Sequence, residues 1–469
     1  MNKNSDKKII FSGACFFHEM ARLRLSICLL FMMLMTSVSS LADQKDVKLF
    51  GDIIRDAMLQ SPDFAIADAR IEQARQSARQ RGSYRFPRID VAAGIGPEHN
   101  DPAPTSDTGH AHTTGKNIKL ALAKLVFDGG ASRSEYQRSL ALTEAASAEA
   151  RIVAEELFRD VVRYYIDYWR FQLESEQAED FIDTMQGLVS KLNTMYTAGA
   201  ASKIEVDFAR ARLASAQGVA STAKSSLNNT FSELEYLMQG LRRFRAMSPE
   251  EFTTLDLLPL SEYMDRGEWS NSGFVTNAYN AEATRLRVNA QRGRLFPTID
   301  FELSGSLVED EGGPSEVRGK AGAKLLLSYT LYNGGERRGA IDRARAQLKE
   351  LEAERLQLER DVFRSIDQSY NSITASQLGL QAVEAEIKAN RELQRLNWKN
   401  LQMGRVNIIE LIDVEERLFN ARARSNEVVS TIYQSYYDLL LSSGYIEQLL
   451  EKFSLQLPEG FGNFADEPR

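Results

Sequence analysis

Three histidines lie close together in the first half of the chain, and histidine is a common ligand for transition metals. They share one polar segment with three prolines: His99, His110, His112, Pro97, Pro102 and Pro104. A His-x-His pair could bind a metal ion, but proline and polar residues together are typical of an exposed loop. We therefore expect an exposed surface loop and no metal site.

The remaining residues do not predict catalysis. The glycine pairs Gly129-Gly130 and Gly334-Gly335 lack the lysine and the spacing of a phosphate-binding loop, so we interpret them as turns. An aromatic cluster falls in a predicted helix, where packing is its ordinary role: Tyr164, Tyr165, Tyr168 and Trp169. Because the three loop histidines are the only ones left after leader removal, no Ser-His-Asp set can form. The sequence predicts that the protein is not an enzyme and needs no cofactor.

The N-terminus has the order of a secretory signal peptide. Arg22 and Arg24 precede a short apolar run, and small residues follow it as far as Ala42, where we expect cleavage. The run is too short for a permanent membrane helix, which needs about 20 residues. Because the basic region is long, we also expect that translation starts at Met20 rather than Met1.

Removal of the leader would leave an acidic chain without cysteine. Cys15 and Cys28 both precede residue 43, so disulfides and thiolate chemistry are excluded from the mature protein. Cys28 stands before most of the apolar run, whereas a lipoprotein cysteine follows the run, so we expect no lipid anchor. The leader carries five basic and two acidic residues, and its loss lowers the net charge from −8 to −11. Such a chain is a poor partner for nucleic acid.

The chain contains two copies of one unit, because three short motifs recur in the same order at nearly the same spacing. Phe86-Pro87 recurs 210 residues later as Phe296-Pro297. Two further motifs recur 205 residues later: Phe127-Asp128-Gly129-Gly130 as Tyr332-Asn333-Gly334-Gly335, and Gly199 with Glu205 as Gly404 with Glu410. We expect each copy to build the same structure.

In each copy two segments of about 10 residues alternate between apolar and polar side chains, which predicts strands with one apolar face. The apolar positions are Ile89, Val91, Ala93 and Ile95; Ile118, Leu120 and Leu122; Ile299, Phe301, Leu303 and Leu307; and Ala321, Ala323, Leu325 and Leu327. Alternation alone more often indicates hairpins packed on a soluble core, but strands of this length can cross a bilayer. Aromatic residues where strands meet helices favour the membrane, because they form girdles at its surface: Phe86, Phe127, Phe296 and Tyr332.

The segments after the two glycine pairs are long and free of proline, which predicts long paired helices. Apolar residues at spacings of three and four between Ala344 and Ile373 indicate a coiled-coil-like seam. A helix from Gly335 to about residue 400 would measure about 100 Å and needs neighbours to be stable. The breaks at 196–202 and 402–407 predict the tips of two antiparallel helical hairpins.

The predicted fold is mainly α-helical with membrane β-strands. Each repeat would consist of a helix, two membrane strands and a long helical hairpin. The expected parts are a signal peptide (1–42), a first repeat (43–240), a linker between the repeats (241–272), a second repeat (273–452) and a C-terminal tail (453–469). Four strands cannot close a barrel, and open strand edges are not tolerated in lipid. Three copies around one axis would give a 12-stranded β-barrel joined to a long α-helical barrel, which together form a conduit.

The Phe-Pro junctions, the FDGG and YNGG junctions and the glycine tips followed by an acid together resemble the TolC family of outer-membrane factors, over roughly residues 45–452. The resemblance implies a homotrimer in the outer membrane of a Gram-negative bacterium, in contact with its lipid and extending into the periplasm. It also implies docking to a periplasmic adaptor (membrane fusion protein) and to an inner-membrane ABC or proton-driven transporter. Such a duct carries proteins or small toxic compounds outward without chemistry of its own.

The resemblance also implies which residues form the periplasmic entrance, just beyond the second tip. Glu410 and Asp413 lie one helical turn apart on one face, and threefold symmetry would make them two acidic rings. By spacing alone they would be ordinary solvated acids of a helix. In the family a basic residue near the acids helps to latch the closed entrance. Val406 stands at the aligned position here, and Arg405 is adjacent.

The residues implied to contact the adaptor are those of the tips: Gly199, Ala200, Met403 and Gly404. The first tip departs from the family pattern, because Ala200 stands where a larger apolar residue is usual. Within the duct interpretation, type I protein secretion and multidrug efflux by a proton-driven pump both remain open, and the absence of a lipid anchor favours secretion. A periplasmic coiled-coil scaffold or adaptor is the alternative of another class.

Overall fold

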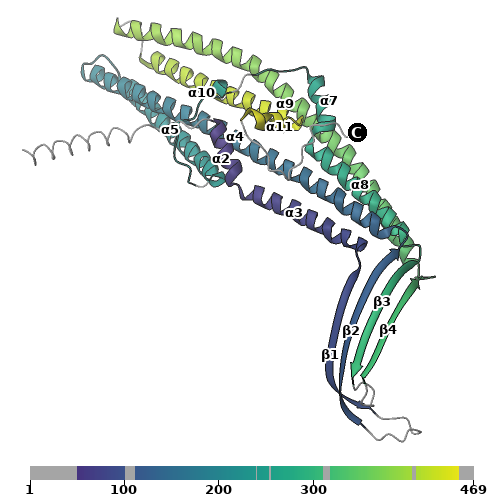
Figure 1. Ribbon diagram of the computed structural model, residues 1–469. Coiled ribbons are helices and arrows are strands. Elements are labelled where there is room, and N and C mark those ends of the chain that lie inside the picture. The colour runs from purple at the N-terminus through teal and green to yellow at the C-terminus, as the bar shows by residue number, and fades with distance from the viewer. Residues whose placement is uncertain are drawn as a thin grey trace, which may run out of the picture. The chain divides into compact units, whose positions relative to one another are not determined.

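The computed structural model describes residues 50–100, 111–238, 240–252, 255–309, 317–403 and 408–453. Residues 49–241 and 246–469 form one compact unit, to which the following refers. Its first half contains α2 (Phe50–Gln60), α3 (Pro62–Gly82), the 3-10 helix η1 (Ser83–Arg85), β1 (Arg88–Asn100), β2 (Ala111–Phe127), α4 (Ala131–Thr197) and α5 (Lys203–Leu237) (Figure 1). Its second half contains α6 (Pro249–Phe252), α7 (Leu260–Ser270), α8 (Ser272–Gly293), β3 (Thr298–Glu309), β4 (Val317–Ser328), α9 (Glu336–Gln402), α10 (Ile408–Ser442) and α11 (Ile446–Lys452).

The two repeats have the same order of elements and nearly the same element lengths. α4 and α9 each have 67 residues, and α5 and α10 each have 35. α2 and α7 each have 11 residues. α4 ends at Thr197 and packs on α5, and α9 ends at Gln402 and packs on α10, so the two predicted helical hairpins are confirmed. The turn of the second hairpin, residues 404–407, lies outside the described residues.

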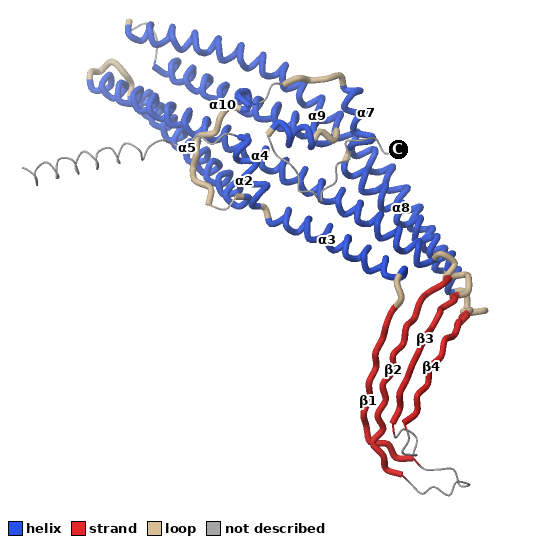
Figure 2. Tube along the Cα trace, in the orientation of Figure 1, coloured by secondary structure: helices blue, strands red, loops and turns tan. Residues whose placement is uncertain are grey.

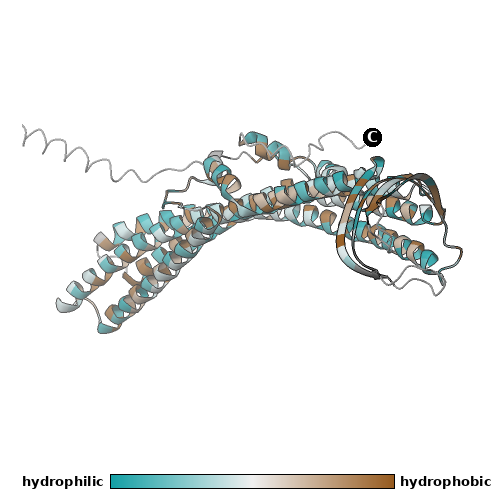
Figure 3. Cartoon of the chain, turned by 60° about the horizontal axis from the view of Figure 1, so that its bottom comes forward, coloured by the Kyte–Doolittle hydropathy of each residue, from teal (hydrophilic) through white to brown (hydrophobic). Residues whose placement is uncertain are grey.

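The four strands form one antiparallel sheet in the order β1-β2-β3-β4, and the pairing of β2 with β3 joins the repeats (Figure 2). Leu122 of β2 stands opposite Ile89 of β1 and Leu303 of β3, so the predicted apolar positions fall on one face of the sheet. Apolar and polar residues alternate along the strands (Figure 3). The strands are 12 to 17 residues long, somewhat longer than predicted.

The longer strands correct the prediction for the histidine segment. β1 and β2 remain paired as far as Asn100 and Ala111, and His99 is the partner of His112 across the two strands. Two of the three histidines therefore lie in paired strands and not in a loop, because the pairing of β1 with β2 continues past Pro97. His110 lies outside the described residues.

The motif after β2 is confirmed as a turn that starts a helix. The Asp128 carboxylate accepts hydrogen bonds from the backbone N–H groups of Gly130 at 3.0 Å and Ser132 at 2.7 Å. These N–H groups at the start of α4 have no acceptor within the helix, so the carboxylate caps it. Gly129 has a φ of +67°, a left-handed conformation that disfavours side chains. A negative side chain at a helix start also complements the helix dipole.

The helices pack around α4, which contacts α3, α5, α8 and α10. Tyr165 and Tyr168 are fully buried on α4, which confirms packing as the role of these two predicted aromatics. The Tyr165 ring lies 4.9 Å from the ring of Phe50 on α2, so α2 is attached to α4 by aromatic packing. Throughout the described ranges, every helix is too short or too polar to cross a membrane.

Candidate functional site

The sheet has an exposed apolar face. The exposed fraction is 67% for Val91, 74% for Ile95 and 70% for Leu325, which are all predicted apolar positions. On the opposite face the Lys324 ammonium lies 2.9 Å from the Glu302 carboxylate. Contiguous exposed apolar surface is rare on soluble proteins, whereas a sheet between lipid and water requires it.

The four predicted interface aromatics lie at the helix-proximal ends of the strands and are exposed: Phe86, Phe127, Phe296 and Tyr332. Phe296 has a second role, because its side chain packs on the backbone of Gly129. A Cβ at Gly129 would lie 2.8 Å from the Phe296 ring and would collide with the carbonyl oxygen of Gly293. Gly129 therefore allows the end of α8 to touch the start of α4.

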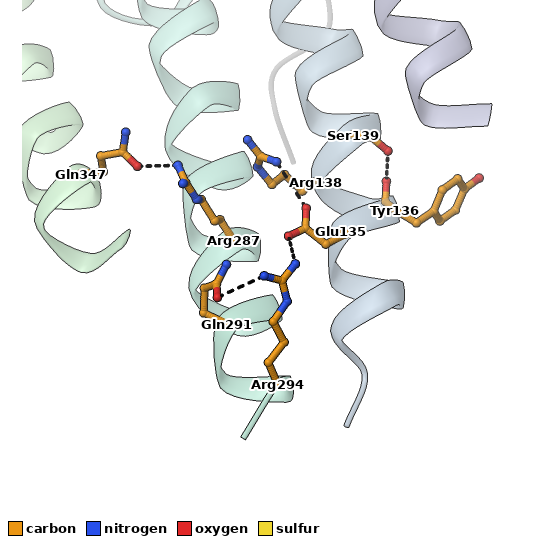
Figure 4. A network of polar contacts seen from close by, with 8 residues as sticks. All are labelled: Glu135, Tyr136, Arg138, Ser139, Arg287, Gln291, Arg294 and Gln347. Carbon is orange, nitrogen blue, oxygen red and sulfur yellow. Dashed lines mark hydrogen bonds and ion pairs between the residues drawn. The ribbon is translucent and has the colours of Figure 1, made fainter. Parts of the chain in front are cut away.

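A polar network just beyond this junction fixes α8 to its neighbours (Figure 4). Glu135 of α4 forms ion pairs with Arg138 at 3.3 Å and with Arg294, after α8, at 3.4 Å. On the other side of α8, Arg287 donates a hydrogen bond to Gln347 of α9 at 2.7 Å. The network joins helices of both repeats close to the sheet.

The first helical tip is a capped turn. Gly199 has a φ of +74°, and Ser202 begins α5 with a capping box in which its hydroxyl accepts from the Glu205 N–H. The Glu205 carboxylate in return accepts from the Ser202 N–H at 2.6 Å. Around this turn Tyr196 and Ile204 are exposed by 47% and 80%, and Ala200 is exposed as well. The tip thus presents apolar side chains to solvent.

The second tip is described only in part. Met403 is exposed by 47% at the end of α9, whereas Gly404, Arg405 and Val406 lie outside the described residues. A hydrophobic core that belongs to both hairpins lies beneath the tips: Met185, Leu188, Leu192, Val206, Ala209, Ala216, Leu401, Ile408, Leu411 and Ile412. The Arg212 guanidinium also lies 3.0 Å from the Glu416 carboxylate, across the two hairpins.

Glu410 and Asp413 lie in the first two turns of α10. Glu410 is exposed and Asp413 is half-buried, and neither carboxylate contacts a basic group within the described residues. Within the described residues, Asp413 contacts a basic side chain only through its backbone oxygen, which accepts a hydrogen bond from the Arg417 guanidinium at 3.2 Å. Glu410 is the third residue of α10, as Glu205 is of α5. An acid at this position stabilises a helix start, so Glu410 has a structural role besides any role in an entrance.

One buried carboxylate near the second tip could not be predicted from the sequence. Glu415 is 6% exposed, and its two oxygens accept hydrogen bonds from the Trp398 indole and the Gln394 amide, each at 2.8 Å. In the first repeat the corresponding residues, Arg210 and Asn193, are hydrogen-bonded at 3.0 Å. The two repeats therefore use equivalent positions for different polar contacts, and nothing in the sequence alone marks these positions as neighbours.

A second buried carboxylate, Glu155, lies in the first half of α4. Burial raises its pKa to about 7, and the Ser272 hydroxyl opposes the shift by donating a hydrogen bond to the carboxylate at 2.6 Å. Arg151, one turn before it, is 2% exposed and lies 3.2 Å from Glu447 of α11. These residues join α4, α8 and α11. Over the described ranges, His, Cys, Asp and Glu side chains form no group of three that could hold a metal ion.

The family model of outer membrane efflux proteins matches residues 53–239 and 274–444, so it covers most of both repeats. A proteases secretion protein, PrtF of Dickeya chrysanthemi, is 20% identical over 64% of this chain and 68% of its own length. The outer membrane protein TolC of Escherichia coli is 20% identical over 84% of this chain and 83% of its own length.

Solved structures agree on the fold. The Campylobacter jejuni CmeC outer membrane channel superposes with a TM-score of 0.76 at 15% identity, over 88% of this chain and 90% of that one. The likeness confirms the predicted TolC-like fold, and the match of the family model to both repeats is consistent with their duplication. This chain belongs to the outer membrane efflux protein family, whose members are channels of the outer membrane that extend into the periplasm.

Proposed function

We propose that the chain is the subunit of a homotrimeric duct that passes an exported protein from an inner-membrane transporter, through a periplasmic adaptor, to the outside of the cell. The observation that supports it best is the four-stranded sheet with its exposed apolar face. Four strands leave two open edges, and a closed barrel needs about eight or more strands. Three copies supply twelve.

Export of a protein, rather than of a small molecule, is supported by the name of one relative, a proteases secretion protein. A strain that lacks the chain should lose one or more large proteins from its medium and keep its drug resistance. If drug susceptibility rises while the secreted proteins stay unchanged, the duct serves a multidrug pump.

We assign the periplasmic entrance to the second tip, with Glu410 and Asp413 as two rings of three carboxylates and Arg405 as the latch beside them. The assignment is supported by the exposure of Glu410 and by the absence of a basic partner for either carboxylate among the described residues. Closely spaced carboxylates on a symmetry axis attract divalent cations. The exposed apolar residues at the tips, among them Ile204 and Met403, support adaptor docking at Gly199, Ala200, Met403 and Gly404.

The entrance is tested by single-channel recording of the purified protein in a planar bilayer. The double change Glu410→Ala with Asp413→Ala should raise conductance and weaken block by divalent cations. Glu205→Ala is the matched control, because it removes the corresponding acid of the first tip and should leave the block unchanged. Equal block in both variants would refute the entrance assignment, and a monomeric mass in detergent would refute the duct.

A further inference from the structure

The polar face of the sheet carries its charged residues unevenly along the strands. Residues that stand opposite each other in an antiparallel sheet share a face, so the pairing of the four strands places each of them. Near the helices this face carries acids and bases together: Arg88, Asp90, Asp300, Glu302 and Lys324. Further along the strands it carries three basic residues, which we call the basic band: Lys119, Arg318 and Lys320.

The acids nearest the basic band on the side of the helices already have partners. The Asp90 carboxylate lies 2.8 Å from the Arg88 guanidinium, and the Glu302 carboxylate lies 2.9 Å from the Lys324 ammonium. In the other direction the next acid of this face is Glu98, which stands four residues, about 13 Å, beyond the outermost row of the band. The acids of this face therefore leave the charge of the basic band uncancelled.

The two lysines of the basic band lie in one row across the sheet. Ser306 of β3 is opposite Lys119 of β2 on one side and opposite Lys320 of β4 on the other. Two strand spacings, about 10 Å, separate the lysines, and both are exposed. Neither ammonium forms an ion pair within the part of the chain that the structure describes. Like charges repel each other at this distance, so the alignment of the two lysines does not stabilise the sheet.

The basic band lies within the strand region and not at its ends. Lys119 stands eight residues from each end of β2, Ala111 and Phe127. At about 3.3 Å per residue, Phe127 is about 26 Å away along the strand. Basic residues that anchor a protein at the membrane surface lie at the level of the interface aromatics, and Lys119 does not. The band is therefore not a set of surface anchors.

We infer that the basic band lines the inside of the strand barrel and binds the carboxylates of an acidic polypeptide on its way out of the cell. The inference rests on the proposed trimer, in which the apolar face meets lipid and the polar face meets the interior. Three copies would bring together three basic residues each, and rings of lysine and arginine attract anions. A chain of carboxylates contacts several of these charges at once, which a small anion cannot do. The exported protein proposed above would then be rich in aspartate and glutamate.

The positive sign of the basic band does not follow from the overall composition. The chain as a whole has a net charge of −8, and the entrance that we assign to Glu410 and Asp413 is acidic. The two sites therefore have opposite signs and can be measured separately. Divalent cations report on the entrance, and anions report on the basic band.

Reversal potentials of the purified protein in a planar bilayer with a salt gradient test whether the basic band lies in the channel. Lys119→Gln should lower the permeability ratio of chloride to potassium, and the double change with Lys320→Gln should lower it by about threefold or more. Lys116→Gln is the matched control. It removes the same charge from the same strand but on the apolar face, where the Lys116 ammonium lies 3.3 Å from the Glu309 carboxylate, so its ratio should stay at the wild-type value.

Polyglutamate tests the chemistry of the exported chain. A short polyglutamate added on the side of the bilayer opposite the helices should block the wild-type current reversibly, and polylysine of the same length should not. The double variant should need about tenfold more polyglutamate for half block, because the ammonium groups of two rows of lysines have left the interior. The block of the wild type should weaken as the salt concentration rises, since salt screens exposed charges.

The outcomes separate the basic band from the duct. Block by polyglutamate that the double variant loses supports the inference, whereas equal block in both proteins overturns it. A changed permeability ratio without any difference in polyglutamate block also overturns it, because the band would then select small anions only. A conducting trimer in which Lys119→Gln and Lys116→Gln have equal ratios refutes the basic band and leaves the duct standing. A monomeric mass in detergent refutes the proposed duct as well.

Discussion

Glu155→Gln should make the helical part of the protein less sensitive to pH. Burial raises the pKa of Glu155 from 4.5 to about 7, so the folded state holds a proton that the unfolded state has already lost. The contribution of Glu155 to the free energy of unfolding is greatest below pH 4.5 and is lost as the pH rises to about 7. One pKa unit corresponds to about 1.4 kcal/mol, so the loss between pH 4.5 and 8 is ~3 kcal/mol. Glutamine keeps an oxygen that can accept from Ser272 and has no charge to bury.

The measurement is urea unfolding of the purified protein in detergent, followed by helical circular dichroism at two pH values, about 5 and 8. The wild type and the variant should be similar in free energy of unfolding near pH 5, and the variant should be more stable at pH 8. Asp438 also has a pKa raised by burial, so a smaller slope in the same direction should persist in the variant. If both proteins lose the same stability between the two pH values, Glu155 is not the group responsible.

Two further substitutions test contacts of the folded chain. Gly129→Ala should destabilise the protein more than Gly130→Ala. Both changes add the cost of a left-handed residue, about 1–2 kcal/mol, but only the first collides with Gly293; equal unfolding midpoints would contradict this packing. Trp398→Phe should lower the free energy of unfolding by about 1–3 kcal/mol, because it leaves one oxygen of the buried Glu415 without a donor. A loss below about 0.5 kcal/mol would mean that water replaces the indole.

Most of the fold could be predicted from the sequence because duplication provides each signal twice. The motif at Phe127 and the motif at Tyr332 independently indicate the end of a strand and the start of a long helix. The alternation around Leu122 and Leu303 gives the apolar face, since side chains on a strand have a period of two.

The features that could not be predicted from the sequence depend on contacts between residues far apart in the chain. Glu415 is hidden by Trp398 and Gln394, and a lone acid in a helical pattern has no local sign of burial. The extended pairing of β1 and β2 was missed because proline and histidine in one segment resemble a loop. The entrance was named from a resemblance, and Glu410 at the third position of α10 also fits an ordinary helix start.

The pairing of β2 with β3 constrains the order of folding. The ion pair between Lys116 and Glu309 joins residues 193 positions apart, whereas β1–β2 and β3–β4 are local hairpins. Contacts of such sequence separation form slowly, because a long loop must close before they yield any stabilisation. The continuous apolar face therefore cannot exist until residues beyond 309 have reached the periplasm. Because the sheet closes late, its complete apolar face is exposed to water only for a short time before it enters the membrane.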